Sequence, residues 1–241
     1  MKAHNARINS QINGKLNGQI NQCFDCHSCR AYDKCLGSSL APNDLNVFKS
    51  LLGNQFIVER GDSLFKQGKP VDGVYILRSG SFKYIYNNTK VNPFQDKILE
   101  FFLNGDIMAL DCLHLPAYAG TAIALESSSV CCISHKKLLS ILPSYPNLLH
   151  ELVKKMSQLN ERVVHRSHES LSARGRILNL VKRMSEHSIA QGGSGKYFNF
   201  PISKSDMANY LGITQETVSR QLSDLKSKKV LCIKQKQVEL Y

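Results

Sequence analysis

The chain has 241 residues, a formal net charge of +12 and 42% hydrophobic residues. This length suits two small domains or one large domain, and the apolar content is enough for hydrophobic cores. The positive charge favours nucleic acid, an acidic membrane surface or an acidic protein as a partner. No apolar run approaches the roughly 20 residues of a membrane-spanning helix, and the polar segment after Lys2 and Arg7 does not resemble a secretory signal. We therefore expect a cytoplasmic protein without a membrane partner.

Cysteines are concentrated near the N-terminus. The chain has eight, and four of them fall in one short segment: Cys23, Cys26, Cys29 and Cys35. Because cytoplasmic thiols are kept reduced, a disulfide framework is not expected, and clustered cysteines there more often bind metal or do redox chemistry. We define residues 23–38 as the cysteine segment. The polar, Asn- and Gln-rich residues 1–22 before it are predicted to be a disordered tail.

Residues 39–145 have the pattern of an antiparallel β domain. A short helix is expected over 45–52, followed by short β-type runs with glycines at their ends, where turns with positive φ are favourable. The expected strands are 55–60, 63–66, 73–77, 81–86, 98–102, 120–125 and 129–133, within a β pattern that extends to about Ile141. Strands at this spacing predict an antiparallel sandwich or barrel, and the absence of strand–helix alternation disfavours a parallel nucleotide-binding sheet.

A long helix is predicted over residues 146–170. Its main apolar stripe recurs at 4-3-4-3 spacing and consists of Leu149, Val153, Met156, Asn160 and Val163. A neighbouring stripe adds Leu152 and Leu159, so the helix is apolar over an arc that needs two partners. A single internal core helix is one interpretation. A dimer seam combined with a packing face on the β domain fits better, with Asn160 as the polar seam residue that fixes register.

The C-terminal part, residues 171–241, is predicted to be a winged helix-turn-helix domain. Ser205 is the expected N-cap of a short helix that runs to Leu211, Gly212 supplies the turn, and Thr214 caps a second helix from Gln215 to about Lys226. In such a motif the second helix enters the major groove of DNA. A helix over 173–187, a strand over 197–200 and a hairpin over 231–238 complete the domain, and the predicted fold class of the chain is α+β.

The outer face of the second helix carries side chains that can read bases. Arg220 can donate two hydrogen bonds to guanine O6 and N7, Glu216 can accept one from cytosine N4, and Ser219 can reach a base edge or a thymine methyl group. The lysines around this face suit phosphate contacts: Lys204, Lys226, Lys228, Lys229, Lys234 and Lys236. The predicted partner is double-stranded DNA.

The stretch NYLGITQETVSRQL resembles the recognition motif of the cyclic-AMP receptor/FNR superfamily, and E-x-x-S-R is typical of its FNR branch. The segments GDSLFKQGKPVDGVYILRSGSFK, FFLNGDIMAL and ALESSSVCCI extend the resemblance to about Cys26–Leu240. The resemblance implies an antiparallel, jelly-roll-like β-roll as the sensor domain, followed by a dimerisation helix. It also implies a homodimer that reads a TTGAT-type palindrome with Glu216, Ser219 and Arg220. RNA polymerase is the expected protein partner, but the hairpin over 84–97 is longer than the family pattern, so no polymerase contacts are carried over.

The resemblance also implies a cofactor. Cys26-x₂-Cys29-x₅-Cys35 matches the spacing of the FNR family's oxygen-labile 4Fe–4S cluster, and its fourth ligand, in an E-x-x-x-V-C motif, falls on Cys131. By residue type alone, four thiolates hold zinc equally well. Cys112 competes with Cys131 for the fourth position, and His27 is a further alternative ligand.

The remaining cysteines are expected to be structural. Cys132 should point to the sheet face opposite Cys131 and act as a small buried hydrophobe. Cysteines upstream of the triad, like Cys23, are often not ligands in this family, and Cys232 lies in the distal wing.

The leading hypothesis is an oxygen- or redox-responsive transcription regulator whose dimerisation is controlled by the cluster. A cyclic nucleotide is not expected, because LHLPAYAGTA stands where the cyclic-AMP binders of the superfamily carry an Arg-Ser phosphate clamp. The rival is a constitutive or other-ligand-responsive DNA-binding regulator with structural zinc at the cysteines. An enzyme is disfavoured, since the chain has no nucleophile elbow, P-loop, HExxH or paired-carboxylate motif.

Overall fold

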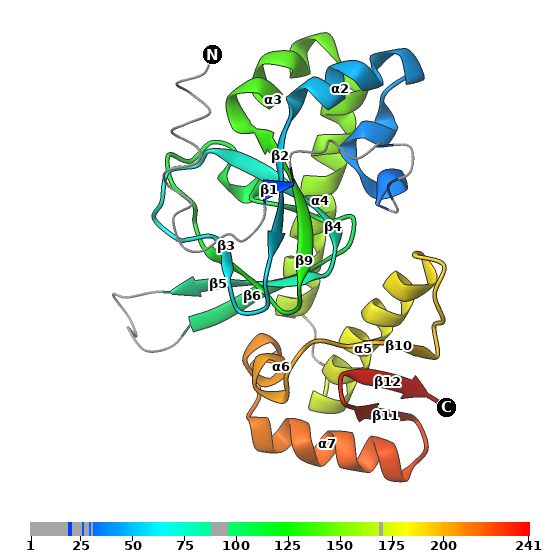
Figure 1. Ribbon diagram of the computed structural model, residues 1–241. Coiled ribbons are helices and arrows are strands. Elements are labelled where there is room, and N and C mark those ends of the chain that lie inside the picture. The colour runs from blue at the N-terminus through cyan, green and yellow to red at the C-terminus, as the bar shows by residue number, and fades with distance from the viewer. Residues whose placement is uncertain (1–18, 21–25, 27–28, 30, 88–95, 169–170) are drawn as a thin grey trace. The chain divides into compact units, whose positions relative to one another are not determined.

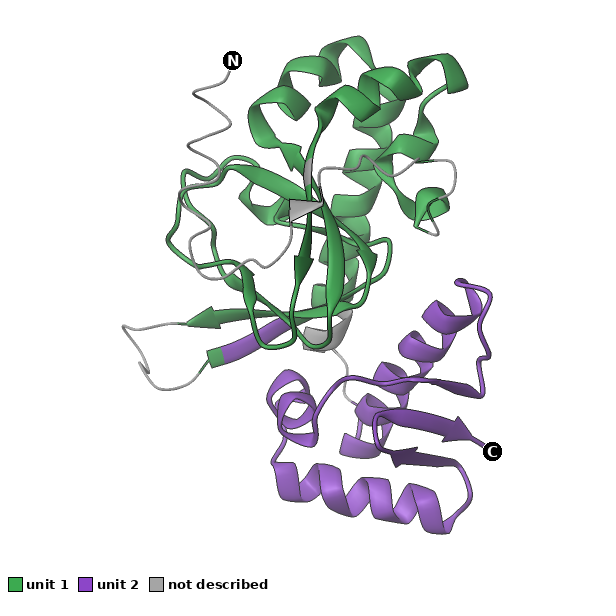
Figure 2. Ribbon diagram, viewed as in Figure 1, with its two compact units in different colours: residues 1–96, 100–164 green, residues 97–99, 165–241 purple. Residues whose placement is uncertain are grey.

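The computed structural model describes residues 19–20, 26, 29, 31–87, 96–168 and 171–241 (Figure 1). Cys23, His27 and the centre of the hairpin over 84–97 lie outside the described residues, as does all of the predicted disordered tail except Gln19–Ile20. The chain forms two compact units, one of residues 1–96 and 100–164 and one of residues 97–99 and 165–241 (Figure 2). Among the described helices, none combines the length and hydrophobicity needed to cross a bilayer.

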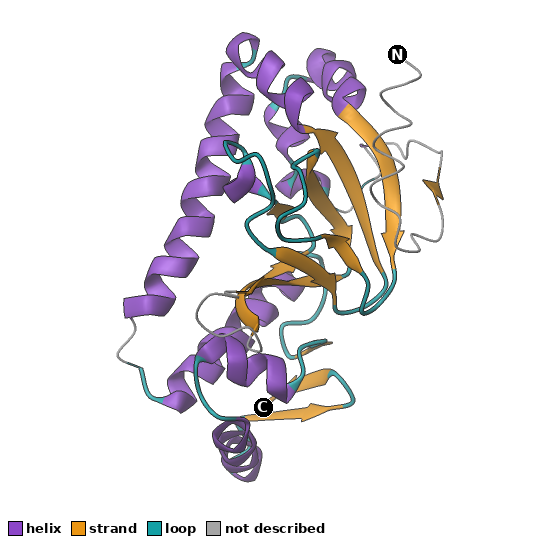
Figure 3. Cartoon of the chain, turned by 90° about the vertical axis from the view of Figure 1, so that its left-hand side faces the viewer, coloured by secondary structure: helices purple, strands orange, loops and turns teal. Residues whose placement is uncertain are grey.

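The first unit is built on two antiparallel sheets (Figure 3). In sheet order, the five-stranded sheet contains β1 (Gln19–Ile20), β2 (Leu52–Val58), β9 (Ser128–Ser134), β4 (Gly73–Ser79) and β7 (Ile107–Met108). The four-stranded sheet contains β3 (Ser63–Phe65), β8 (Thr121–Ala124), β5 (Ser81–Asn87) and β6 (Asp96–Leu103). The predicted antiparallel β domain is thus confirmed. The two strands missed by the sequence analysis, β1 and β7, have only two residues each, too few to show alternation.

Aromatic side chains fill the interior of this β domain. The ring of Phe65 stacks on Tyr118 with 4.3 Å between centroids and on Tyr75 with 5.6 Å, and Tyr84 meets it edge-on. All four side chains are buried. The hydroxyls of Tyr75 and Tyr118 both donate to the carboxylate of Asp72, so the polar ends of these rings have partners inside the fold.

The outer face of the five-stranded sheet is covered by helices and short 3-10 turns. The helices are α2 (Leu45–Leu51), α3 (His135–Ile141) and the start of α4 (Pro146–His168), and the turns are Tyr32–Lys34, Leu36–Ser39 and Pro42–Asp44. One hydrophobic core joins Leu36, Phe48, Ile133 and Leu138 to Leu148 on α4. The expectation that the β pattern continues to Ile141 is wrong after Ser134, because Leu138 and Leu142 are buried while Ser140 between them is exposed, a pattern that fits a helix and not a strand.

Helix α4 has one buried face and one exposed apolar face. Leu148 and Leu152 are buried in the core just described, and Leu159 is partly buried. The predicted seam is exposed, with Leu149, Val153, Met156 and Val163 between 38% and 55% exposed and Asn160 beside them. The interpretation as a single internal core helix is therefore wrong for this chain.

The second unit contains the predicted helix-turn-helix and wing. Its helices are α5 (Ala173–Ile189), α6 (Lys204–Leu211) and α7 (Gln215–Ser227), and its sheet has the order β10 (Tyr197–Asn199), β12 (Gln237–Leu240), β11 (Leu231–Lys234). Ile177, Leu180 and Val181 on α5 are buried, and α5 contacts both α6 and α7. Gln235 and Lys236, both with positive φ, form the tight turn between β11 and β12.

Candidate metal centre and nucleic-acid interface

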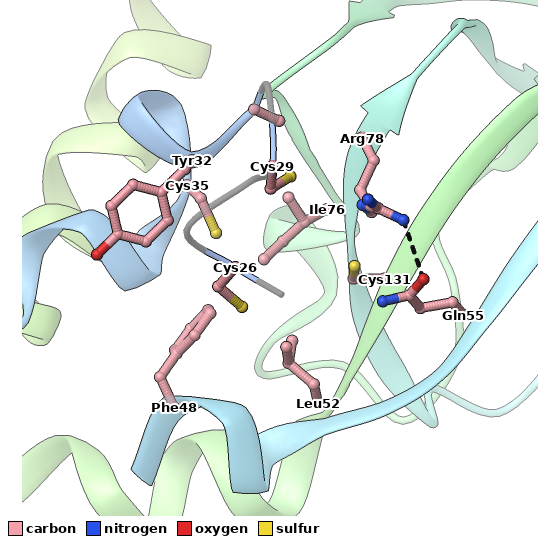
Figure 4. A pocket seen from close by; sticks show the side chains of 11 residues that line it. Cys26, Cys29, Tyr32, Cys35, Phe48, Leu52, Gln55, Ile76, Arg78 and Cys131 are labelled. Atoms are coloured by element: carbon pink, nitrogen blue, oxygen red, sulfur yellow. Dashed lines mark hydrogen bonds between the residues drawn. The ribbon is translucent and has the colours of Figure 1, made fainter. Parts of the chain in front are cut away.

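Four of the predicted ligands line one small cavity of the first unit (Figure 4). Cys26, Cys29 and Cys35 approach it from the cysteine segment, and Cys131 approaches it from β9. The rest of the described lining is formed by Ala31, Tyr32, Phe48, Leu52, Gln55, Ile76 and Arg78. Residues distant in sequence thus meet at one place.

The described part of the cysteine segment is a series of tight turns. The amide of Cys29 donates to the carbonyl of Cys26 (3.2 Å), that of Tyr32 to Cys29 (2.9 Å), and that of Cys35 to Tyr32 (2.8 Å). In such i to i+3 turns, residues three apart lie above one another. Cys26, Tyr32 and Cys35 pack against the core that contains Leu36 and Phe48. Local hydrogen bonds and hydrophobic packing therefore direct the thiols towards β9.

Cys131 occupies a central strand. It is paired in register with Gln55 on β2 and Ile76 on β4, and all three line the cavity. Cys132 points to the opposite face, where its thiol lies against Gly73, in agreement with the sequence-based expectation. A strand places successive side chains on opposite faces, so only one of the two adjacent cysteines reaches the cavity.

The other described cysteines lie elsewhere. Cys112 is buried in the 3-10 turn Leu110–Cys112, where its Sγ accepts a hydrogen bond from the amide of Ala119 (3.3 Å), and it is not among the cavity-lining residues. Cys232 is buried on β11 in the second unit. Of the two candidates for the fourth position, the structure brings Cys131, rather than Cys112, to the triad.

Burial raises the pKa of two thiols at the cavity. It raises the pKa of Cys35 and of Cys131 to about 12, and at Cys131 the nearby Arg78 guanidinium partly opposes this effect. Arg78 is held by a hydrogen bond from its Nη1 to Oε1 of Gln55 (2.9 Å). Because a metal binds thiolates, loading this site must release protons.

The donor set identifies which ions would fit. No carboxylate or imidazole belongs to the described cavity lining, which excludes a typical Mg²⁺ or Ca²⁺ site there. Soft thiolates instead suit zinc or an iron–sulfur cluster. Among the residues that the structure describes, no group of three His, Cys, Asp or Glu side chains is arranged to hold a metal ion. The thiols line the cavity but do not enclose an ion in this arrangement.

The recognition helix of the second unit is fixed by its caps. The Thr214 Oγ1 accepts a hydrogen bond from the amide of Thr217 (3.1 Å), as expected for an N-cap, and Gly212 adopts φ +65° in the turn. The expected N-cap of α6 is corrected: Ser203, not Ser205, accepts from the amide of Asp206 (3.0 Å). Ser205 lies within the helix, because α6 begins at Lys204, two residues earlier than an N-cap at Ser205 would place it.

The outer face of α7 presents the predicted base-reading residues. Val218, Leu222 and Leu225 are buried, whereas the side chains of Arg220 and Glu216 are 72% and 77% exposed. Arg220 donates to Glu216 across one helical turn, and Ser219 is partly buried beside them. The three residues are on one helix, and two of them hold each other in position.

Five of the six predicted phosphate-contacting lysines are exposed, and Lys236 is partly buried. The ammonium group of Lys228 pairs with Asp224 at 2.8 Å, which offsets part of its charge.

Comparison with known proteins identifies both units. Residues 56–145 match the family model of the cyclic nucleotide-binding domain, and residues 175–240 match that of the Crp-like helix-turn-helix domain. The chain is 30% identical to the transcriptional regulatory protein btr of Bordetella pertussis, covering 89% of this chain and 88% of the relative. It is 28% identical to the electron transport regulator A of Shewanella oneidensis (88% and 85% covered).

A third relative, the fumarate and nitrate reduction regulatory protein of Salmonella typhi, is 26% identical, with 89% of this chain and 86% of the relative covered. Among solved structures, FixK2 from Bradyrhizobium japonicum is similar with a TM-score of 0.69 and 20% identity, covering 78% of this chain and 92% of that one. The structural similarity supports the fold, and the relatives and the two family models support the assignment. This chain therefore belongs to the FNR branch of the cyclic-AMP receptor/FNR superfamily of DNA-binding transcription regulators.

Proposed function

We propose that this protein is an oxygen- or redox-responsive transcription regulator that carries a 4Fe–4S cluster and binds a TTGAT-type palindrome as a homodimer. The ligands of the cluster would be Cys26, Cys29, Cys35 and Cys131. The observation that carries the proposal is the convergence of these four thiols on one cavity beside the base of α4. When bound, the cluster supplies an oxygen-sensitive link between the cysteine segment and β9.

The names of the relatives support a regulator of anaerobic metabolism, for which an oxygen-labile iron–sulfur cluster is a better sensor than zinc. One relative is an anaerobic regulatory protein of Pasteurella multocida, and others are fumarate and nitrate reduction regulatory proteins. A regulator with structural zinc is the second candidate, because a set of four thiols also suits a closed tetrahedral zinc site.

The hydrophobic core connects the cysteines to α4, the helix of the proposed dimer seam. Cys26 and Cys35 pack against the same hydrophobic cluster that contains Leu148 and Leu152 of α4. If Cys26, Cys29, Cys35 and Cys131 held a cluster, the cysteine segment would be fixed against β9 and one packing of α4 would be favoured. Release of these cysteines would relax that packing. A coupling free energy of about 1–3 kcal/mol between the two is sufficient for a switch.

A second connection between the cysteine segment and α4 passes through the turn at Gly105. Lys34, next to Cys35, lies so close to Gly105 that a Cβ added there would stand 2.7 Å from the Cβ of Lys34. The adjacent Asp106 accepts from Arg162 of α4 at 3.1 Å. A rearrangement of the cysteine segment therefore reaches α4 through the turn at Gly105 as well as through the core.

The β domain offers little to a cyclic nucleotide. Its interior is occupied by the packed rings of Phe65, Tyr75, Tyr84 and Tyr118. The segment LHLPAYAGTA contains no Lys or Arg that could bind a phosphate. These features support a sensor that responds through its cysteines.

The exposed stripe of α4 is the proposed dimer seam, and α7 is the proposed DNA-reading helix. A two-fold symmetric dimer presents two copies of α7 to half-sites about one DNA turn apart. Glu216, Ser219 and Arg220 would read the bases, and the surrounding lysines would bind phosphates. RNA polymerase is the proposed protein partner of the DNA-bound dimer. The cytoplasm is the proposed location of the regulator.

The experiment is purification without oxygen, followed by visible absorption spectroscopy and assays for iron and sulfide. We expect a brown protein with broad visible absorption that bleaches in air. A colourless protein that contains zinc would contradict the cluster and favour the second candidate.

A further inference from the structure

One charged side chain stands at the cysteine cavity without any role in the function proposed above. Arg78 follows the buried run Val74–Leu77 on β4, and it is only partly exposed. Among the described residues that line the cavity, it is the one cation. A charged residue at the end of an apolar strand, next to buried thiols, requires an explanation.

Arg78 is held in place by Gln55 on β2. Oε1 of Gln55 accepts from Nη1 of Arg78 at 2.9 Å. Gln55 is itself buried, with 5% exposure, and it is the register partner of Cys131. Figure 4 shows the two side chains meeting beside Cys131, one from β4 and one from β2, the strands that flank β9.

The charge of a loaded site needs such a cation. Four thiolates around Zn²⁺, or around a 4Fe–4S core of charge 2+, leave a net charge of 2− in a largely apolar cavity. Burying an uncompensated anion is unfavourable, and a fixed guanidinium nearby reduces this cost.

We propose that Arg78, oriented by Gln55, compensates the negative charge of the loaded four-thiolate site and thereby controls its metal affinity. This inference rests on the proposed function, because it takes the four cysteines as ligands. Arg78 acts through the ligands as a positioning and charge-compensating residue, and it does not bind the metal itself.

Cobalt(II) tests this directly, since its thiolate charge-transfer absorption reports binding without any iron–sulfur assembly. The full-length reduced protein is titrated without oxygen against a competing chelator. We expect Arg78→Met to weaken Co²⁺ binding about 10- to 100-fold, the typical effect of losing an outer-shell partner. Arg78→Lys should recover most of the affinity by restoring the charge, and Gln55→Leu should give an intermediate loss.

Arg60→Met is the matched control, because Arg60 is exposed and outside the cavity lining, and it should bind Co²⁺ like the wild type. An affinity of Arg78→Met within twofold of wild type would overturn the inference while leaving the four ligands intact. So would an Arg78→Lys variant as weak as Arg78→Met, since charge would then not be the cause. If the wild type and Cys131→Ser gave the same spectrum, the ligand assignment would fail, and the role of Arg78 with it.

Discussion

On α7, the side chains of Arg220 and Glu216 form an ion pair with each other. Their ion pair lies across one turn of α7 on a highly exposed face. A pair this exposed contributes little to stability, but it restricts two flexible side chains to the face that enters the groove. If Arg220 reads a guanine, as proposed, the same carboxylate would orient its guanidinium.

Replacing Arg220 therefore tests base reading. Arg220→Ala should lose about 1–3 kcal/mol of binding free energy on a TTGAT-type palindrome and relax the preference at the guanine. Fluorescence anisotropy with palindromes altered at single positions measures both effects. Lys234→Ala is the control, since loss of a phosphate contact should weaken binding evenly across sequences. Unchanged sequence preference in Arg220→Ala would refute the proposed register of α7.

The adjacent cysteines of β9 provide a matched pair for the metal centre. Cys131→Ser should abolish cluster binding, because a hydroxyl is a poor ligand for a soft metal, whereas Cys132→Ser should retain it. Both thiols are buried, so both substitutions change a similar environment. Iron and sulfide content after anaerobic purification gives the result. A cluster that survived Cys131→Ser but was lost in Cys112→Ser would move the fourth ligand to Cys112.

Cysteine spacing and the family resemblance predicted the four cysteines that line the cavity, but not the residues that support them. Gln55 and Arg78 matter because β2, β9 and β4 are paired in one particular register, and a single strand carries no information about its neighbours. In the sequence, the only indication of Arg78 was that a charged residue follows directly on the apolar run Val74–Leu77. Ser203 and Ser205 are both good N-caps by type, and only the hydrogen bond to Asp206 distinguishes them.

At the scale of elements, long periodic segments were predicted well and short ones were not. The double stripe of α4 predicted both its buried and its exposed face, and the structure has both. The seven residues of α3 were missed, because α3 has a single buried leucine, Leu138, and its spacing of four to Leu142 fits a strand as well as a helix. Strand β7 has two residues and depends on its partner β4.

The exposed stripe of α4 leads to a prediction about its polar member. Asn160→Leu should tighten the dimer by about tenfold or more, since a buried leucine contributes about 1.5–3 kcal/mol. The variant should therefore remain dimeric, and bind DNA, even in air. Sedimentation equilibrium of the aerobic protein measures this. Asn179→Leu, on an exposed position of α5, is the control and should leave the equilibrium unchanged. A monomeric Asn160→Leu protein would show that the seam lies elsewhere.

At the scale of the whole molecule, the proposed switch depends on a dimer of marginal stability. The stripe spans Leu149 to Val163, is interrupted by Asn160 and is only partly apolar. A ligand can shift an equilibrium only by its differential binding energy, so a very stable dimer could not be controlled by one cluster. A short, interrupted seam beside the core that carries the cysteine segment satisfies this condition.

The most direct test of this coupling is sedimentation velocity of the anaerobic protein before and after exposure to air. Binding to a full palindrome and to an isolated half-site is measured on the same samples. We predict that air increases the monomer fraction and weakens binding to the full palindrome far more than binding to the half-site, because only a dimer engages both recognition helices. A tight dimer in both states, with palindrome binding unchanged by air, would contradict control of dimerisation by the cysteine site.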